Sequence, residues 1–264
     1  MIELSIVIPT CNRAPLLRKA IDSIRAAVSC AYEIVVVDGA STDGTQRVLD
    51  GLQREMGNAL RVIREKKREG FVRAVNKGFR AAKGQFLIWL NDDARPLANS
   101  LDSAVQHLKK APADVGLVAL YHRCGAARSV ALEKVHNGAT FRLMHVRGTL
   151  YANFGLGRRE LFEQLDYFDE RYYVNGGDPD FSLKVWTAGL RVVPAESAFI
   201  DHDEYHDDRR ADDNPRGQLD NAALFEKWQL PPKNPIRNDF DPARPCTVRG
   251  LRSALEQDLT PVIA

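Results

Sequence analysis

The chain of 264 residues lacks several features that would assign it directly to a class of protein. No apolar run approaches the roughly 20 residues needed to cross a bilayer, so no membrane-spanning segment is expected. Its four cysteines are scattered, without the close pairs typical of metal sites, which favours reduced thiols in a cytoplasmic protein. The formal net charge of +2 is too small to favour nucleic acid as a partner.

The first residues, MIELSIVIPT, have neither a basic leader nor a small-residue cleavage site and are expected to form a strand. A cytoplasmic location is therefore expected, with a peripheral contact at the inner face of a membrane left open. Hydrophobic content of 44% and charged content of 27% are typical of a globular protein that buries a core.

The first half of the chain alternates strand patterns with helix patterns. Four short, β-branched and nearly continuous apolar segments are expected to be strands: 4–9, 33–38, 60–65 and 85–90. Amphipathic helices are expected between them, the first with Asn12 as its cap and Pro15 in its first turn. The pattern predicts an α/β fold with a doubly wound, mostly parallel sheet.

The second half is less regular. Strands are expected at 116–122 and 190–195, and helices near 157–166 and 180–188. The last sixty residues are rich in Asp, Arg, Asn and Pro and are expected to lie on the domain or to be partly mobile.

Polar and acidic residues follow three of the expected strands, as PTCNR (9–13), DGAS (38–41) and NDD (91–93). Ligands of open α/β sheets bind outside the carboxyl ends of the strands, so these segments are candidates for a binding site. The adjacent carboxylates of Asp92 and Asp93 would repel each other unless a cation lies beside them. A solvated turn is the alternative.

Four blocks occur in an order that resembles family-2 glycosyltransferases of the GT-A fold: SIVIPTCNR, VVVDGASTDGT, REGFVRAVNKGFRAAKGQFLIWLNDD and the long block from LFEQLDYFDE to AFIDH. The resemblance covers about residues 3–202. It implies a metal-dependent inverting enzyme that moves a sugar from a UDP- or dTDP-sugar to the hydroxyl of a glycan, lipid-linked or small-molecule acceptor. Surface polysaccharide or other glycoconjugate biosynthesis would be the setting, and a homodimer is left open.

The resemblance also implies a division of the chain. Residues 1–120 would be the nucleotide-sugar-binding half of a single GT-A type, Rossmann-like domain, and residues 121–205 its smaller acceptor-side and catalytic half. Residues 206–264 would be a C-terminal extension without a counterpart in the family.

The residues that the resemblance assigns to the nucleotide lie at the first two strand ends. They are Pro9, Thr10, Asn12, Arg13, Asp38 and Ser41. Asp38 would accept a hydrogen bond from the N–H of a pyrimidine ring, because a carboxylate accepts in two directions. The alternative is that Asp38 and Ser41 only form a turn that starts the next helix.

The family's acidic motif falls on residues 91–93. The resemblance makes Asp93 the ligand of a divalent cation, Mn²⁺ or Mg²⁺, while Asp92 contacts the ribose or orients the diphosphate. Asn91 stands where many relatives carry Asp, which leaves fewer acidic ligands. His202 is the expected second ligand and would favour manganese, whereas His206 is more typical of a solvated loop.

The expected catalytic base is Asp178, at the start of a helix in YVNGGDPDFSLKVWTAG. With Pro179 after it, Asp178 would also suit a helix N-cap, and capping alone is the alternative. Gly177 stands where relatives commonly carry Glu, which leaves Asp180 as the second candidate for the base.

Two other functions stay open at this point. Gly177 and Asn91 would fit a non-catalytic module that binds a sugar nucleotide or a glycan. A nucleotidyltransferase that makes sugar nucleotides would need a glycine-rich loop after the first strand, which PTCNRAPLL lacks. Aromatic residues that could stack on a sugar, or belong to the core, are Tyr151, Tyr172, Tyr173 and Trp186.

Overall fold

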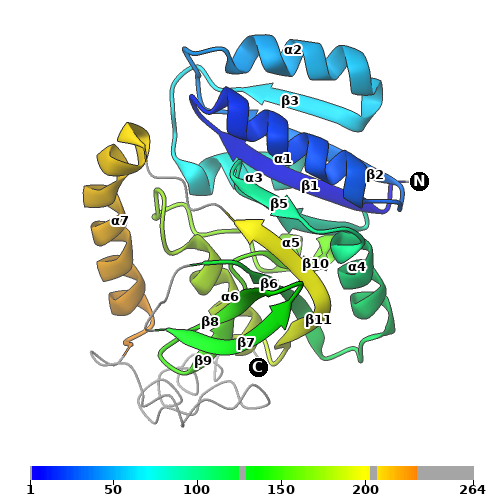
Figure 1. The fold of residues 1–264 in the computed structure, drawn as a ribbon. Helices are drawn as coiled ribbons and strands as arrows, with labels where there is room; N and C mark the ends of the chain where they lie inside the picture. Colours follow the sequence, from blue (N-terminus) through cyan, green and yellow to red (C-terminus); the bar gives the residue numbers. More distant parts are fainter. Residues whose placement is uncertain (1, 125–128, 203–206, 231–264) are drawn as a thin grey trace.

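The computed structural model describes residues 2–124, 129–202 and 207–230 (Figure 1). His206 and Cys246, on which the sequence raised expectations, lie outside these residues. The three cysteines within them, Cys11, Cys30 and Cys124, are free thiols. None of the helices in the described segments is both long and apolar enough to cross a membrane.

The first half forms three successive strand–helix–strand units, as the apolar pattern predicted. The strands are β1 (Leu4–Thr10), β2 (Tyr32–Asp38), β3 (Leu60–Arg64) and β4 (Phe86–Trp89), and the helices are α1 (Ala14–Ala27), α2 (Thr45–Met56) and α3 (Phe71–Ala81), with the short 3₁₀ turn η1 (Gly57–Ala59) before β3. These strands are parallel and lie in the order β3-β2-β1-β4. The direction of winding reverses between β1 and β4, which is where open α/β sheets bind ligands.

The second half continues the same sheet. Its elements are β5 (Ala94–Pro96), α4 (Ser100–Lys110), β6 (Val115–His122), β10 (Gly155–Arg158), α5 (Arg159–Gln164), α6 (Gly177–Thr187) and β11 (Arg191–His202). β10 runs antiparallel between β4 and β6, β6 pairs parallel with β11, and β11 pairs antiparallel with β5. The sheet therefore passes through both predicted halves, and the boundaries of those halves stay a prediction.

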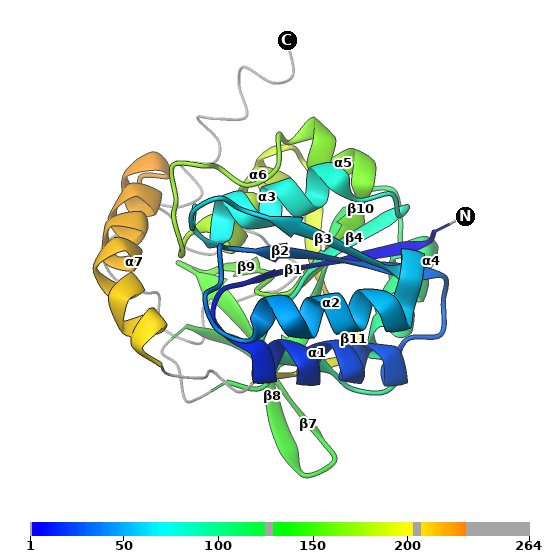
Figure 2. The same ribbon diagram turned by 90° about the horizontal axis from the view of Figure 1, so that it is seen from above.

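The sequence predicted β6, β11, α5 and α6 but missed α4, β5 and β10. β10 carries glycine where a strand pattern needs apolar side chains, because a Cβ at Gly155 would collide with the ring of Trp89. β5 has only three residues, too few for a recognisable alternation. Three further antiparallel strands, β7 (Val130–His136), β8 (Ala139–Val146) and β9 (Thr149–Tyr151), form a small sheet attached to β6, from which the β7–β8 hairpin projects (Figure 2).

Helix α7 (Asp208–Lys227) comes from the segment predicted as an extension. It stands on the side of the molecule toward which β1 runs, opposite the start of that strand (Figures 1 and 2). Asp207 caps it by accepting a hydrogen bond from the Arg210 N–H, at 2.9 Å.

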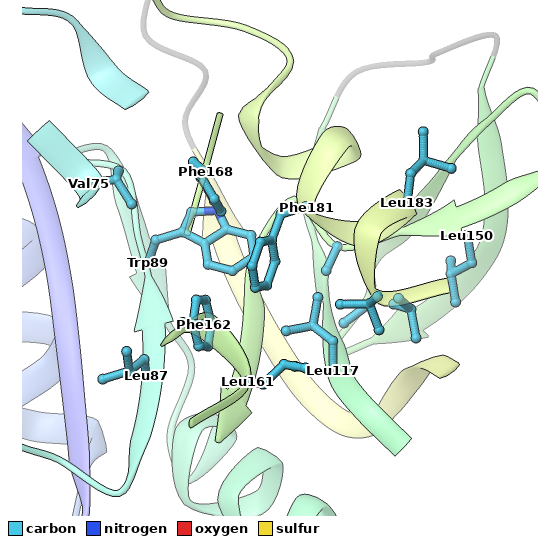
Figure 3. Packing of buried hydrophobic residues seen from close by; sticks show 14 of the residues in the cluster. Val75, Leu87, Trp89, Leu117, Leu150, Leu161, Phe162, Phe168, Phe181 and Leu183 are labelled. Atoms are coloured by element: carbon cyan, nitrogen blue, oxygen red, sulfur yellow. The ribbon is translucent and has the colours of Figure 1, made fainter. Parts of the chain in front are cut away.

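Aromatic side chains from the two halves of the chain pack together in one part of the core. Trp89 of β4 meets the edge of Phe168 with ring centroids 5.0 Å apart, and Phe162 stacks on Phe181 of α6 at 4.7 Å (Figure 3). All four rings are buried. The cluster fixes the position of α6 relative to β4, and predicted site residues lie on α6 and directly after β4.

One capping prediction is wrong. The residue before α1 is Arg13, and its side chain makes no capping hydrogen bond; the first N–H of the helix, that of Ala14, is instead accepted by Asp43 Oδ2 at 3.3 Å. Asn12 has a left-handed backbone, and its amide oxygen accepts the Thr42 N–H at 2.7 Å. Asn12 therefore joins the loop after β1 to the loop after β2 instead of capping the helix.

Candidate active site

A cavity of about 340 Å³ opens at the carboxyl ends of β1 and β4. Six of the residues predicted from the sequence line it: Pro9, Arg13, Asp92, Asp93, Asp178 and His202. They come from four separate segments of the chain, around residues 9–13, 92–93, 178 and 202, so the fold has brought them together. Their position matches the point at which the winding of the sheet reverses.

The other predicted nucleotide residues, Thr10, Asn12, Asp38 and Ser41, do not line this cavity. Thr10 lies behind it and donates a hydrogen bond from Oγ1 to Asp92 Oδ2, at 2.8 Å. Ser41 Oγ accepts the Asn12 N–H at 2.9 Å, which adds a second link between the two loops. These hydrogen bonds hold Asp92 and the loops after β1 and β2 in place next to the cavity.

Asp38 is fully buried. Its Oδ1 accepts the Ser41 N–H at 3.0 Å, which is the turn that the alternative interpretation predicted. Its Oδ2 accepts no hydrogen bond from the described residues. The side chain of Arg68 packs against Gly39, next to Asp38, and its guanidinium pairs with Asp213 of α7. Contact between Asp38 and a nucleotide base therefore stays a prediction.

The two adjacent carboxylates share one guanidinium. Arg13 Nη1 lies 3.1 Å from Asp92 Oδ1 and 3.3 Å from Asp93 Oδ2, and all three side chains are buried. Burial raises the pKa of Asp92, and the positive charge of Arg13 opposes that rise. Arg13 is thus the cation that a pair of neighbouring carboxylates requires, and the solvated turn is excluded.

Arg13 also joins the acidic motif to α7. Its Nε and Nη2 donate to the two carboxylate oxygens of Asp207, at 2.7 and 3.0 Å. Burial by itself would lower the pKa of Arg13, but these bonds and the charges of Asp92 and Asp93 outweigh it, so the pKa lies above its ordinary value. A permanent positive charge therefore lies at the wall of the cavity.

His202 lies beside Asp93 because β11 returns along β5. In that antiparallel pair His202 is opposite Ala94, the residue after Asp93. His202 Nε2 is 3.2 Å from Asp93 Oδ1 and 3.2 Å from Asn91 Nδ2. The ring of His122 lies behind it, with centroids 6.2 Å apart, and burial lowers the pKa of His122 to about 3, so that ring is neutral.

Asp93 and His202 fit a divalent cation as a pair. Two neighbouring ligands of an octahedral ion with bonds of about 2.1 Å lie about 3 Å apart. The separation of 3.2 Å between Asp93 Oδ1 and His202 Nε2 is close to that value. No group of three or more metal-binding side chains occurs within the described residues, so a bound ion would need further ligands from water or a substrate.

Asp178 faces the cavity from the first turn of α6. The helix begins one residue earlier, and its N-cap is Gly176, so the interpretation of Asp178 as the cap is wrong. Its side chain is half-buried, and burial raises its pKa to about 7. A carboxylate with such a pKa is a much better proton acceptor at neutral pH than an exposed one.

The structure explains the glycine before Asp178 and excludes the second candidate for the base, Asp180. A Cβ at Gly177 would lie 2.7 Å from the ring of Phe168, so the fold leaves no space for a side chain there. Asp180 is fully buried away from the cavity and accepts hydrogen bonds from Tyr172 at 3.1 Å and from Trp228 at 2.7 Å. Asp180 therefore belongs to the buried core behind α6 and is not placed to act as a base.

Sequence reasoning missed the contribution of α7 to the cavity. Arg209, Arg210 and Asp213 line it, although their segment was predicted only as a C-terminal extension without a counterpart in the family. Arg209 and Asp213 approach each other to 3.9 Å. The mixed charges of this segment are equally typical of a solvated surface, so composition alone offered no signal.

Comparison with known proteins assigns the chain to a family. The sequence profile of Glycosyl transferase family 2 matches residues 5–166. The chain belongs to glycosyltransferase family 2. This family-2 glycosyltransferase is 30% identical over 138 residues to the GalNAc(5)-diNAcBac-PP-undecaprenol beta-1,3-glucosyltransferase of Campylobacter jejuni, which covers 52% of the chain and 43% of that protein. It is 28% identical over 240 residues to the uncharacterized glycosyltransferase YwdF of Bacillus subtilis, covering 88% of the chain and 87% of the relative.

Solved structures show the same fold. The mannosyltransferase PcManGT from Pyrobaculum calidifontis, in complex with GDP-Man and Mn²⁺, has a TM-score of 0.68 at 21% identity, over 99% of this chain and 74% of its own. TarS 1–349 of S. aureus, in complex with UDP-GlcNAc, has a TM-score of 0.60 at 20% identity, over 78% of this chain and 60% of its own. The prediction of a GT-A fold is confirmed. The match to the Campylobacter protein spans less than half of that relative, so activity and substrates are matters for proposal.

Proposed function

We propose that this protein transfers a sugar from a UDP- or dTDP-sugar to an acceptor hydroxyl with inversion, in the biosynthesis of a surface polysaccharide or another glycoconjugate. One observation carries the proposal: a single cavity has Asp93 and His202 on one wall and the raised-pKa carboxyl of Asp178 on another. Support for a nucleotide-sugar donor comes from the neighbours in complex with GDP-Man and with UDP-GlcNAc.

In the proposed reaction Asp178 accepts the proton of the acceptor hydroxyl while that oxygen forms a bond to the anomeric carbon. The bond from the anomeric carbon to the diphosphate oxygen breaks, and the nucleoside diphosphate leaves with the electron pair. Attack from the face opposite the leaving group inverts the anomeric centre. The cavity would accelerate the transfer by holding the two substrates next to each other. Asp178 would accelerate it further by accepting the proton.

Asp93 and His202 would hold a divalent cation, Mn²⁺ or Mg²⁺. Such an ion, when bound, neutralises the negative charge that develops on a leaving diphosphate. Asp92 is oriented by Thr10 and Arg13 and would contact the ribose or the diphosphate. Arg13 lies on the cavity wall but is paired with Asp92, Asp93 and Asp207, so the cation would supply the positive charge that an anionic diphosphate requires.

The test is a panel of UDP-, dTDP- and GDP-sugars with Mn²⁺ and a set of glycan acceptors, read as release of nucleoside diphosphate and as the anomeric configuration of the product by NMR. Asp178→Asn should keep the donor affinity of the wild type and reduce transfer by about 10²–10⁴-fold, since it removes only the base. Full transfer by this variant, or retention of configuration, would refute the mechanism. Donor binding without any release would instead support the non-catalytic module.

A further inference from the structure

One buried carboxylate of α7 fastens the loop that leads to Asp178. Asp220 Oδ1 accepts the N–H of Tyr173 at 3.0 Å, and Asp220 Oδ2 accepts those of Val174 at 2.8 Å and Asn175 at 2.9 Å. Asp220 is buried, although it lies on a helix that is otherwise mostly solvent-exposed. A carboxylate that satisfies three consecutive backbone donors is a specific arrangement, because charge-assisted hydrogen bonds of this kind are the strong ones.

The bonded loop is part of the cavity wall. Val174, Asn175 and Gly176 all line the cavity, and Gly176 is the left-handed N-cap after which α6 and Asp178 begin. The loop is also held at Tyr173, whose carbonyl oxygen accepts the Val72 N–H at 3.3 Å. Any movement of the loop would therefore move the helix start that carries Asp178.

Residues of both α7 and the loop at 173–175 allow the two segments to pack closely. A Cβ at Gly217, one turn before Asp220, would lie 2.5 Å from Asn175 Nδ2, so α7 approaches this loop without an intervening side chain. The guanidinium of Arg216 lies over the ring of Tyr173 at 4.1 Å from its centroid. These contacts give the carboxylate of Asp220 access to the backbone.

We infer that Asp220 is a positioning residue for the catalytic base: it holds residues 173–175 so that Asp178 meets the acceptor hydroxyl. This inference rests on the proposed function, in which Asp178 is the base. The predicted donor-side residues Arg13, Asp92, Asp93 and His202 lie in the loops after β1 and β4 and on β11, and none of them makes these bonds. Loss of the bonds should therefore affect the chemical step and leave donor binding intact, because small displacements of a reacting group are costly.

The experiment compares the full-length wild type with Asp220→Asn, Asp220→Glu and the control Asp212→Asn, an exposed aspartate on the same helix. An amide at position 220 has one acceptor oxygen and turns its NH₂ toward at least one backbone donor. We expect kcat of Asp220→Asn to fall by about ten- to a hundredfold with the KM for the donor unchanged. Amide hydrogen exchange of residues 173–176 should accelerate. Asp220→Glu, which keeps both oxygens, should recover part of kcat, and Asp212→Asn should behave as wild type.

A kcat of Asp220→Asn equal to that of the wild type, or equal losses in Asp220→Asn and Asp220→Glu, would overturn the positioning role. Equal effects on kcat and on the donor KM would overturn it as well, because they indicate a general loss of structure. The wild type and Asp178→Asn are measured in the same assay. Transfer by the wild type that Asp178→Asn abolishes supports the proposed function even if the Asp220 variants are unaffected, so the two failures are distinguishable.

Discussion

Two aspartates of one helical turn show how strongly position decides the chemistry of a residue. Asp178 and Asp180 are two residues apart on α6, so their side chains point to nearly opposite faces of the helix. Asp178 faces the cavity and its pKa is raised to about 7 by burial, whereas Asp180 points into the core, where Lys227 lies 2.6 Å away. The sequence offered both as candidates, and only one reaches the cavity.

The raised pKa of Asp178 predicts the pH dependence of transfer. A base must be unprotonated, so kcat/KM should rise with pH up to a pKa of about 7 and then level off. The measurement is a pH–rate profile at saturating Mn²⁺. The residual activity of Asp178→Asn should lack this rise, and a wild-type profile that is flat across pH 7 would contradict the assignment.

A second prediction at the residue scale concerns Asp93. Asp93→Asn keeps the shape of the side chain but removes the charge 3.2 Å from His202, so the protein should need more Mn²⁺ to bind UDP. Calorimetric titration of UDP at several Mn²⁺ concentrations measures this requirement without any acceptor. Asp201→Asn is the control, because Asp201 is the neighbour of His202 and pairs with Arg95 outside the cavity. Equal Mn²⁺ dependence of wild type and Asp93→Asn would exclude Asp93 as a ligand.

At the scale of elements, α7 is the part of the molecule whose role differs most from expectation. Its amino-terminal end is tied to the loop after β1 through Asp207 and Arg13. Past its carboxyl-terminal end, Trp228 donates to Asp180 of α6. A segment predicted as an extension therefore bridges the two sides of the cavity.

The contact between α3 and β1 supports a prediction about stability. A Cβ at Gly78 of α3 would collide with Val7 of β1, whereas nothing lies within 4 Å of a Cβ at Gly51 of α2. Gly78→Ala should lower the free energy of unfolding by about 1–3 kcal/mol through overpacking. Gly51→Ala is the matched control and should raise it by about 0.5–1 kcal/mol, because alanine favours the helix. Urea denaturation of both variants measures the difference, and a stable Gly78→Ala would show that the interface can relax.

At the scale of the whole molecule, the cavity is assembled from residues between Pro9 at the end of β1 and Asn221 on α7. A ligand that bridges these walls binds only the folded chain. UDP and Mn²⁺ together, at about 100 times the dissociation constant, should stabilise it by about 2.7 kcal/mol and raise the melting temperature by several degrees. Thermal unfolding with UDP, Mn²⁺ or both measures this effect, and the absence of any shift would argue against a donor in this cavity.

The amino-acid sequence by itself determined the α/β class, the parallel strands of the first half and the motifs at their ends. The apolar runs and helix periods are local properties of the chain, and parallel strands necessarily finish at one edge of their sheet. It also identified six residues that line one cavity, through the resemblance of their motifs to the family.

Only the tertiary structure decided which polar residues share an environment. The pairing of β11 with β5 brings His202 to Asp93, and the docking of α7 brings Asp220 to the loop before Asp178. These contacts join segments far apart in the chain. Burial in the folded protein then raises the pKa of Asp178. Because burial and long-range pairing depend on the packing of the whole chain, no local pattern of residues contains them.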